Sequence, residues 1–386
     1  NSIGMTQLGK LKPNDLRGKT IFIRCDFNVP LRSTPKGLYR VADDTRIRRF
    51  LDLTFRKIHE LTDGDCRIII GSHLGRPHKT KDQTGWDGIF NIQFISSHFD
   101  TLIRRIYGDT YTIFPPETID SHMQHSLDIV SHKRLPPGGI KFLPNLRYLL
   151  DPKNTDLYRI EFIAKLADVA DVYINCAFGC SHRITKSIKL LPQLMRQEGK
   201  LVVSGVLLYE EIYRLGKFAG KILSQPKKTM VVTGGAKISD KIEILKQFVS
   251  TGVKSILIGG KMANAFLLAQ QQKELLQPFQ KDTLPAKLQS QVEAKNNELL
   301  HEINLAEKII ELAEANKVNL HLPEDYKVVT DYQSTSFENK TSPDFSKELQ
   351  LDLGEKTINQ FEEIFKDIEN VFWNGPLGAY DHPASS

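Results

Sequence analysis

The sequence predicts an α/β protein built on parallel sheets, with helices packed on both faces of each sheet. Short runs rich in β-branched residues alternate with amphipathic stretches throughout the 386 residues, and such alternation is typical of βαβ units. The predicted strands are Thr20–Arg24, Arg67–Gly71, Ile140–Leu143, Val172–Asn175, Thr229–Thr233, Ser255–Gly259, Val318–Leu322 and Val371–Trp373. The predicted helices include Arg46–Leu61, Asp156–Leu166 and Glu302–Ala315.

Length and composition indicate a globular protein of about two domains. Hydrophobic residues make up 40% of the chain and charged residues 25%, which are ordinary values for a soluble protein. The net charge of +6 is spread along the chain without a Lys/Arg-rich run. This distribution argues against nucleic acid as the main partner and suits a small anionic substrate.

The sequence also predicts a cytoplasmic location and no membrane partner. No apolar run approaches the ~18 residues of a membrane span, and the N-terminal residues lack the apolar core of a signal peptide. Because residue 1 is Asn, we expect a processed chain or a fragment. The four cysteines are few for this length, which suggests a reducing compartment. Cys176 and Cys180 form an isolated C-x-x-x-C pair that fits core or loop thiols better than metal ligands.

A domain boundary is predicted between Lys189 and Gly205, where a proline and a glycine interrupt an apolar segment. The following residues, Val206–Ile222, form a continuous amphipathic pattern of helical period. We therefore expect a first domain over residues 1–200, a linking segment over 201–222 that forms the interdomain helix, and a second domain over 223–386.

Three arginines follow predicted strands of the first domain, and a fourth, Arg46, lies where a predicted helix begins. Ligands bind beyond the carboxyl ends of strands in parallel sheets, and guanidinium groups match phosphate and carboxylate oxygens. A single surface arginine is more often simply solvated, but several at strand ends predict a pocket for a compact polyanion. The residues concerned are Arg46, Arg76, Arg147 and Arg183.

A glycine turn marks the second domain. Gly234 and Gly235 follow the predicted strand Thr229–Thr233, and a helical pattern comes next. Free backbone N–H groups and the helix dipole at such a turn attract anions. Lys237 and Lys241 are four residues apart, so we expect both ammonium groups on one side of the first helical turn. An ordinary βα turn with two solvated lysines is the alternative to a phosphate site.

Six segments in order resemble phosphoglycerate kinase. They are Arg24–Pro30 (RCDFNVP), Ser72–Pro77 (SHLGRP), Ala177–Arg183 (AFGCSHR), Gly234–Lys241 (GGAKISDK), Ile258–Phe266 (IGGKMANAF) and Trp373–Gly378 (WNGPLG). The resemblance implies two doubly wound α/β domains joined by a helix, with a cleft between them that closes during the reaction. It also implies reversible phosphoryl transfer between 1,3-bisphosphoglycerate and ADP, giving 3-phosphoglycerate and Mg·ATP in glycolysis. The family is usually monomeric.

The resemblance assigns the first domain to phosphoglycerate. By matching position, Asp26 and Asn28 hold the glycerate hydroxyl and carboxylate region, and Arg46 stabilises the transferring phosphoryl group. The remaining matches contact the oxygens of phosphoglycerate or lie beside those that do. They are His73, Arg76, Arg147, His182 and Arg183.

The resemblance assigns the second domain to ATP or ADP with Mg²⁺. Lys237 follows the moving phosphoryl group as the second catalytic cation, and Lys241 contacts the nucleotide phosphates. The other matched positions line the nucleotide: Gly235, Gly259 and Gly260 under the adenosine, Asn374 and Pro376 along the nucleotide, and Asp381 at the ribose, where the family usually has a glutamate.

The chain departs from the family in a few places. Cys176 stands for an aspartate, Cys180 for a threonine, Pro144 for a glutamate and Lys261 for a small residue. The sequence also lacks the family's G-G-G-D turn, whose aspartate holds Mg²⁺. We therefore expect a kinase whose sequence is C-terminally incomplete. The alternative is a truncated, inactive relative that acts as a phosphoglycerate-binding or structural protein; an unrelated sugar or acyl-phosphate kinase would need six ordered motifs to coincide.

Overall fold

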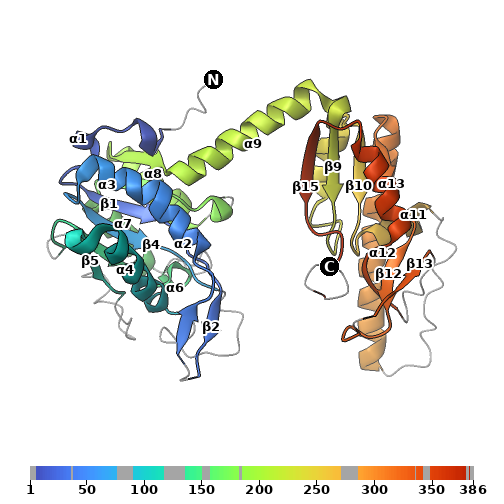
Figure 1. The fold of residues 1–386 in the computed structure, drawn as a ribbon, viewed down its shortest axis with the longest axis horizontal. Coiled ribbons are helices and arrows are strands. Elements are labelled where there is room, and N and C mark those ends of the chain that lie inside the picture. Colours follow the sequence, from blue (N-terminus) through green and yellow to red (C-terminus); the bar gives the residue numbers. More distant parts are fainter. Residues whose placement is uncertain are drawn as a thin grey trace. The chain divides into compact units, whose positions relative to one another are not determined.

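The computed structural model describes residues 6–35, 38–75, 90–116, 135–149, 157–181, 185–270, 286–334, 336–341, 348–379 and 382. The chain divides into two compact units, Asn1–Leu215 and Gly216–Ser386 (Figure 1). The division falls inside helix α9, Val206–Ser224, so one continuous helix contributes to both units. This helix matches the predicted helix over 206–222.

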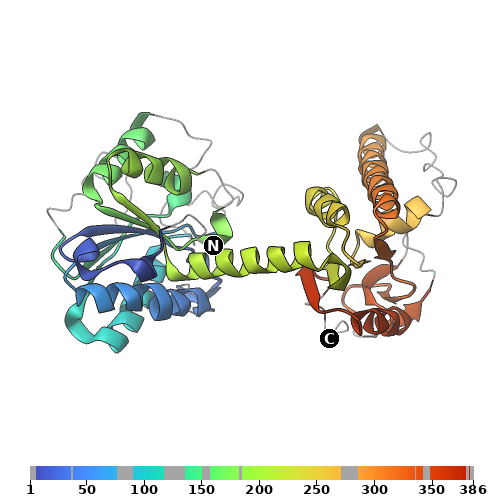
Figure 2. The same ribbon diagram turned by 90° about the horizontal axis from the view of Figure 1, so that it is seen from above.

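The first unit is organised around a six-stranded parallel sheet in the order β5-β6-β4-β1-β7-β8 (Figure 2). Strands β1, β4 and β7 occupy the predicted residues, β6 begins one residue early, and β5 and β8 were not predicted. The bounds are β1 Thr20–Arg24, β4 Arg67–Gly71, β5 Thr112–Phe114, β6 Gly139–Phe142, β7 Val172–Asn175 and β8 Leu201–Ser204.

Strand β8 changes the expected linking segment. Residues 201–204 pair in parallel with β7 at the edge of this sheet, so they belong to the first unit. Gly205 follows, and α9 begins at Val206. The strand is only four residues long, Leu-Val-Val-Ser, and lies inside the apolar segment where the sequence predicts a domain boundary.

Both faces of the first-unit sheet are buried, as the apolar strands predict. Side chains alternate along β1: Ile21 and Ile23 pack into one core with α2, α3 and α4, whereas Phe22 packs into the other with α7 and α8. The sheet is therefore covered by helices on two sides. The helices are α1 Pro13–Leu16, α2 Thr45–Phe50, α3 Arg56–Thr62, α4 Gln93–Tyr107, α6 Leu146–Leu149, α7 Leu157–Val169 and α8 Leu191–Gln197.

Three further local features complete the first unit. The helix predicted over 46–61 is formed by α2, a π-helical turn over Leu51–Phe55 and α3 in succession. A second π-helical segment, Lys186–Leu190, precedes α8. A small antiparallel hairpin, β2 Leu31–Ser33 with β3 Tyr39–Val41, follows the loop after β1.

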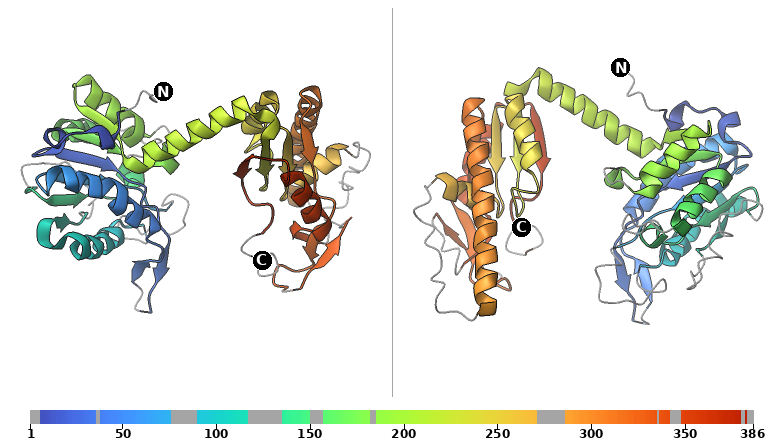
Figure 3. Two further views of the ribbon diagram at one scale, coloured as in Figure 1. Left: turned by 45° about the horizontal axis from the view of Figure 1, so that its top comes forward. Right: turned by 180° about the vertical axis from the view of Figure 1, so that it is seen from behind.

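The second unit has a four-stranded parallel sheet in the order β11-β10-β9-β15. Its strands are β9 Thr229–Thr233, β10 Ser255–Ile258, β11 Asn319–His321 and β15 Asn370–Asn374, all close to the predicted ranges. Figure 3 shows α12, Ala286–Ala315, as the long helix beside this sheet, and Ile303 and Ile309 of α12 share a core with Ile256 of β10. The other helices are α10 Ile242–Thr251, α11 Ala263–Gln270 and α13 Glu355–Phe365.

A second, antiparallel sheet in this unit was not predicted. It has the order β13-β12-β14, with β12 Tyr326–Val329, β13 Glu338–Lys340 and β14 Leu349–Leu353. Strand β14 has the sequence LQLDL, in which polar and apolar residues alternate. Such a strand lacks the continuous apolar run by which the buried parallel strands were recognised.

In the part of the chain that the structure describes, no helix combines the length and the apolar character needed to cross a bilayer.

Candidate functional site

The polar residues of the first unit gather at the carboxyl ends of its central strands. From β1 the chain proceeds to β4 on one side and later returns to β7 on the other. Ligands bind in open α/β sheets at such a reversal. Asp26 follows β1, His73 follows β4, and the loop Ala177–Ser181 follows β7. The fold thus brings three of the predicted segments to one edge of the sheet.

Arg46 is held at this edge by Asp26. Arg46 lies in the first turn of α2, and its Nη1 is 2.8 Å from Oδ2 of Asp26. The arginine side chain is 54% exposed and the aspartate 16%, so the guanidinium keeps donors available to a ligand. The second oxygen of Asp26, Oδ1, is buried and has no hydrogen-bond partner in the described chain. One predicted catalytic cation is therefore fixed beside a predicted substrate residue.

Asn28 and Arg147 both bind Gly75 in the loop after β4. The Gly75 N–H donates to Oδ1 of Asn28 at 2.8 Å, and Nη1 of Arg147 donates to the Gly75 carbonyl. Gly75 has a φ of 58°, and an added Cβ would lie 1.9 Å from the Phe90 ring. Only glycine fits this position. Because Asn28 follows β1, Gly75 follows β4 and Arg147 follows β6, the two hydrogen bonds connect the ends of these three strands.

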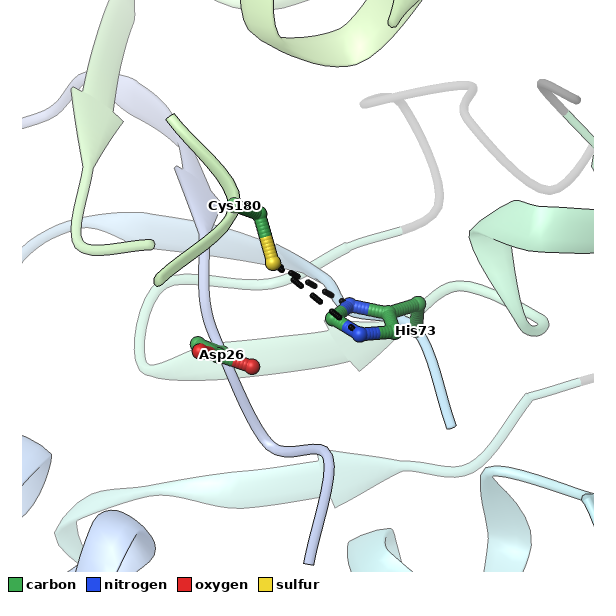
Figure 4. A group of neighbouring side chains, drawn as sticks. All are labelled: Asp26, His73 and Cys180. Atoms are coloured by element: carbon green, nitrogen blue, oxygen red, sulfur yellow. Dashed lines mark hydrogen bonds between the residues drawn. The ribbon is translucent and has the colours of Figure 1, made fainter. Parts of the chain in front are cut away.

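His73 lies in a buried polar cluster that the sequence did not reveal (Figure 4). Its Nδ1 is 3.4 Å from Nη2 of Arg24 and 3.7 Å from Sγ of Cys180. Arg24 is buried as well; its Nε donates to Oγ of Ser187 at 3.2 Å, and its Nη1 donates to the Cys25 carbonyl. The available signal was a charged residue ending the otherwise apolar strand TIFIR.

Four of the predicted site residues lie outside the described residues. They are Arg76, His182, Arg183 and Asp381. The predicted gathering of arginines therefore has a structural counterpart only for Arg46 and Arg147, which both contact loops at the carboxyl edge of the first-unit sheet.

The predicted glycines of the second unit form three turns that pack against one another. Gly234 and Gly235 follow β9, Gly259 and Gly260 follow β10, and Gly375 follows β15. An added Cβ at Gly234 would lie 2.0 Å from the Pro376 carbonyl oxygen, and one at Gly260 would lie 2.6 Å from the Gly235 nitrogen. The turns touch backbone to backbone, so Gly235, Gly259, Gly260, Asn374 and Pro376 are neighbours.

Lys241 lies at these turns and Lys237 does not. The Lys241 ammonium donates to the carbonyl oxygen of Asn374 at 2.6 Å and to its Oδ1 at 3.1 Å. Burial lowers the pKa of Lys241. Lys237 instead forms an ion pair with Glu298 of α12, which raises the pKa of Lys237 and lowers that of Glu298.

The prediction that both lysines leave one side of a helical turn was therefore wrong. Helix α10 begins only at Ile242, and the residues before it form bends at 235, 236 and 238 and a turn over 239–241. The N–H groups of Ile238 and Ser239 donate to Oε2 of Glu302 at 2.5 and 3.2 Å. The Glu302 carboxylate of α12 therefore accepts hydrogen bonds from backbone N–H groups that would have been free to bind an anion if a helix began at this turn. The available signal was the spacing of Glu298 and Glu302, four residues apart, although the predicted helix began only at Glu302 and α12 begins at Ala286.

The two units offer complementary chemistry for anions. The first presents guanidinium and imidazole side chains at strand ends, which suit a compact, multiply charged oxyanion. The second presents glycine turns that bring the backbone close to a ligand, with an ammonium group beside them. The guanidinium and ammonium groups of the two arrangements can bind an oxyanion and stabilise its charge.

Comparison with known proteins gives a consistent result along the chain. The sequence profile of the family described as phosphoglycerate kinase matches residues 11–386. The phosphoglycerate kinase of Gloeobacter violaceus is 30% identical over 376 residues, covering 96% of this chain and 81% of that protein. The phosphoglycerate kinase of Syntrophobacter fumaroxidans is 31% identical over 382 residues, covering 98% and 82%.

Solved structures agree with the fold. The phosphoglycerate kinase structure from Coxiella burnetii has a TM-score of 0.65 at 22% identity, and that from Pyrococcus horikoshii has a TM-score of 0.68 at 21% identity. Each alignment covers 98% of this chain and 82% of the solved chain.

Proposed function

Because this chain belongs to the phosphoglycerate kinase family, we propose that its two units divide the substrates between them, with phosphoglycerate on the first and nucleotide on the second. The enzyme is a phosphotransferase with a carboxyl group as acceptor. It transfers a phosphoryl group reversibly between 1,3-bisphosphoglycerate and ADP, giving 3-phosphoglycerate and ATP in glycolysis. No observation favours the inactive, truncated alternative.

The ion pair between Arg46 and Asp26 carries the assignment of the first unit. The pair places a half-exposed guanidinium at the reversal point of the sheet. A phosphate group of a ligand can replace water as the acceptor of its N–H groups there. We assign Asp26 and Asn28 to the glycerate hydroxyl and carboxylate. His73 and Arg147 contact the remaining oxygens, and Arg76, His182 and Arg183 join them by family resemblance.

The packed glycine turns support the nucleotide assignment. Space beside Gly235 is open as far as the Lys241 side chain, 3.6 Å from an added Cβ, so a ligand can lie against the backbone there. Gly259 and Gly260 pack against Leu377 and Gly235 and support this turn, and Asn374 and Pro376 border it. Lys241 lies beside the same turns, where its ammonium group donates to Asn374, and we assign it to a nucleotide phosphate. Asp381 is assigned to the ribose from its sequence position alone.

Catalysis rests on Arg46 and Lys237. Phosphoryl transfer asks for little covalent chemistry from the protein and depends on positioning and charge neutralisation. Cations at the equatorial oxygens lower the barrier by several kcal/mol, on the order of what one oxyanion donor contributes. Lys237 pairs with Glu298 in this structure, so we propose that it leaves this exposed partner when the phosphoryl group is present.

Magnesium is proposed to accompany the nucleotide, as in the family generally. In the described part of the second unit, no group of three His, Cys, Asp or Glu side chains is arranged to hold an ion. The predicted nucleotide contacts there are glycines, Lys241, Asn374 and Pro376, and Mg²⁺ requires oxygen ligands, mostly carboxylates and phosphates. The described residues therefore do not form a magnesium site, and we assign none of them to the metal.

Cytoplasmic location is also a proposal. All four cysteines are buried free thiols, which suits a reducing compartment.

A coupled assay tests the proposed function. We expect ATP-dependent consumption of 3-phosphoglycerate by the wild-type chain, and loss of this turnover in Arg46→Ala. Calorimetry with each ligand alone then tests the division of substrates. Phosphoglycerate binding should weaken in Arg46→Ala, and Mg·ATP binding should weaken in Gly234→Ala. Phosphoglycerate binding without any turnover by the wild-type chain would instead support the inactive relative.

A further inference from the structure

We propose that Asp26, His73 and Cys180 form a binding site for a thiophilic divalent cation, with Zn²⁺ as the best match. Each residue offers one ligand atom, and these atoms lie within 4.8 Å of one another. Figure 4 shows the carboxyl group, the imidazole ring and the thiol facing one another at the carboxyl ends of β1, β4 and β7. His73 and Cys180 are 5% and 7% exposed, so an ion here would be largely shielded from water.

The donor set selects the kind of ion. A thiol, an imidazole and a carboxylate together suit Zn²⁺, whereas Mg²⁺ takes oxygen ligands. A tetrahedral Zn²⁺ with bonds of about 2.0–2.3 Å holds its ligand atoms roughly 3.3–3.8 Å apart. Sγ of Cys180 already lies 3.7 Å from Nδ1 of His73, so small side-chain movements would complete three ligands. The fourth position would remain open to water, as in catalytic zinc sites.

A second observation points to a missing ligand. Oδ1 of Asp26 is buried without a hydrogen-bond partner in the described chain, although buried carboxylate oxygens ordinarily have one. Oδ2 is already engaged by Arg46. An ion bound through Oδ1 would satisfy this atom and leave the Arg46 pair intact.

Among the described residues, Arg24 and Arg46 face the cluster and oppose a cation. Arg46 contacts Asp26 at 2.8 Å, and Nη2 of Arg24 lies 3.4 Å from Nδ1 of His73. An ion on Nδ1 would displace this last contact, but Arg24 keeps Ser187 and the Cys25 carbonyl as partners. Bound Zn²⁺ deprotonates a coordinating thiol, so the proton of Cys180 goes to solvent. The thiolate and the Asp26 carboxylate then supply two negative charges, which match the charge of the ion but leave the charges of Arg24 and Arg46 as the opposing contribution.

The expected consequence is competition with phosphoglycerate. This consequence rests on the proposed function, since Asp26 and His73 are assigned there to the substrate; ion binding itself does not. Cys180 has no assigned role in turnover and occupies a position where the family usually has threonine. Replacement of Cys180 by threonine should therefore remove the ion site and spare the kinase activity.

Cobalt titration of the reduced, metal-free full chain tests the site. We expect Co²⁺ to give a thiolate-to-metal charge-transfer absorption that Zn²⁺ abolishes by displacement. Cys180→Thr should lose this absorption and bind Zn²⁺ at least about 100-fold more weakly, the upper end of the loss when only an outer-shell partner is removed. Cys66→Ser is the matched control, because Cys66 is also buried in the first unit but contacts Thr62.

The outcomes separate the two proposals. Absence of the absorption in the wild type, or its persistence in Cys180→Thr, would overturn the ion site whether or not the enzyme turns over. Cys180→Ser provides the same comparison if the threonine variant does not fold. If 3-phosphoglycerate reduces the cobalt signal, both the site and the substrate assignment gain support. A cysteine-dependent signal that phosphoglycerate leaves unchanged would support the ion site and contradict the assignment of Asp26 and His73 to substrate.

Discussion

The two units build their candidate sites from different parts of the chain. In the first unit, charged and polar side chains such as Arg46, Asp26 and His73 meet at strand ends. In the second, glycine turns meet backbone to backbone, and one ammonium group, that of Lys241, lies over them. Both lie at carboxyl ends of parallel strands, so one architectural rule has produced two kinds of surface.

The difference predicts two kinds of sensitivity. A site made of side chains depends on the chemical identity of a few groups, and removal of an exposed one such as Arg46 should change activity more than stability. A site made of packed backbone depends on the absence of Cβ atoms, so substitutions there should disturb folding and ligand binding together. The following substitutions test this contrast.

Replacement of Arg46 should have the largest effect. We expect Arg46→Ala to lower kcat by about 10³-fold or more, the range for an arginine that stabilises a transferring phosphoryl group. Stability should change little because the arginine is half exposed. Arg48→Ala is a matched control, since Arg48 lies on the same helix, is 53% exposed and pairs with Asp44 at 2.8 Å. Steady-state kinetics measures kcat for both variants. An equal loss of kcat in Arg48→Ala would show that Arg46 has no special role at the site.

A methyl group at Gly234 should affect both stability and nucleotide binding. Its Cβ would lie 2.0 Å from the Pro376 carbonyl oxygen, so we expect Gly234→Ala to lose about 1–3 kcal/mol in free energy of unfolding and to raise KM for ATP. Gly220→Ala is the control: nothing lies within 4 Å of its added Cβ inside α9, and it should stabilise by about 0.5–1 kcal/mol. Denaturant unfolding of both variants would show the opposite signs, and matching signs would contradict the packing argument.

Asp325 provides a contrast with Asp26, because its carboxylate accepts hydrogen bonds from backbone N–H groups instead of pairing with an arginine. Its oxygens accept the Thr357 N–H at 2.8 Å, the Thr357 hydroxyl at 2.7 Å and the Lys356 N–H at 3.1 Å, at the start of α13. Burial acts to raise the pKa of Asp325, but these hydrogen bonds outweigh it and lower the pKa below its ordinary value. The ionised form therefore stabilises the fold above the unfolded pKa of about 3.9, and this contribution disappears as pH falls through the lower folded pKa.

Asp325→Asn should accordingly lose about 1–3 kcal/mol of unfolding free energy at pH 7. The difference from wild type should shrink as pH falls below about 4. Urea unfolding at several pH values measures this difference. A gap that stays constant down to the folded pKa would show that the charge of Asp325 is not the source of its contribution.

The smallest effect is expected at Glu298. Its ion pair with Lys237 joins two side chains that are each about half exposed, and such pairs contribute little to stability. We expect Glu298→Gln to leave the melting temperature unchanged within error and kcat within about twofold. A large rise in kcat would instead identify the pair as a restraint on Lys237.

Particular residues show how far the sequence reaches. The strand Thr20–Arg24 and the residues Asp26 and Asn28 after it were predicted in place, because an apolar run ending in polar residues is a local pattern. The neighbours of Gly235 were predicted only through the family resemblance. Arg24 contacts His73, which lies 49 positions further along the chain. Glu302 accepts hydrogen bonds from Ile238 and Ser239, which lie 64 and 63 positions before it. No periodicity in the chain encodes such pairs.

The sequence by itself determined the α/β class, the central strands and the identity of the residues at their ends, because hydrophobic runs and turn residues act over short distances. Only the tertiary structure decided which of those residues meet. It placed Arg46 on Asp26, separated Lys237 from Lys241, and brought Cys180 to His73, because sheet order and helix packing are fixed by burial of both faces of each sheet. A side chain's partner is therefore set by where its strand lies in the sheet.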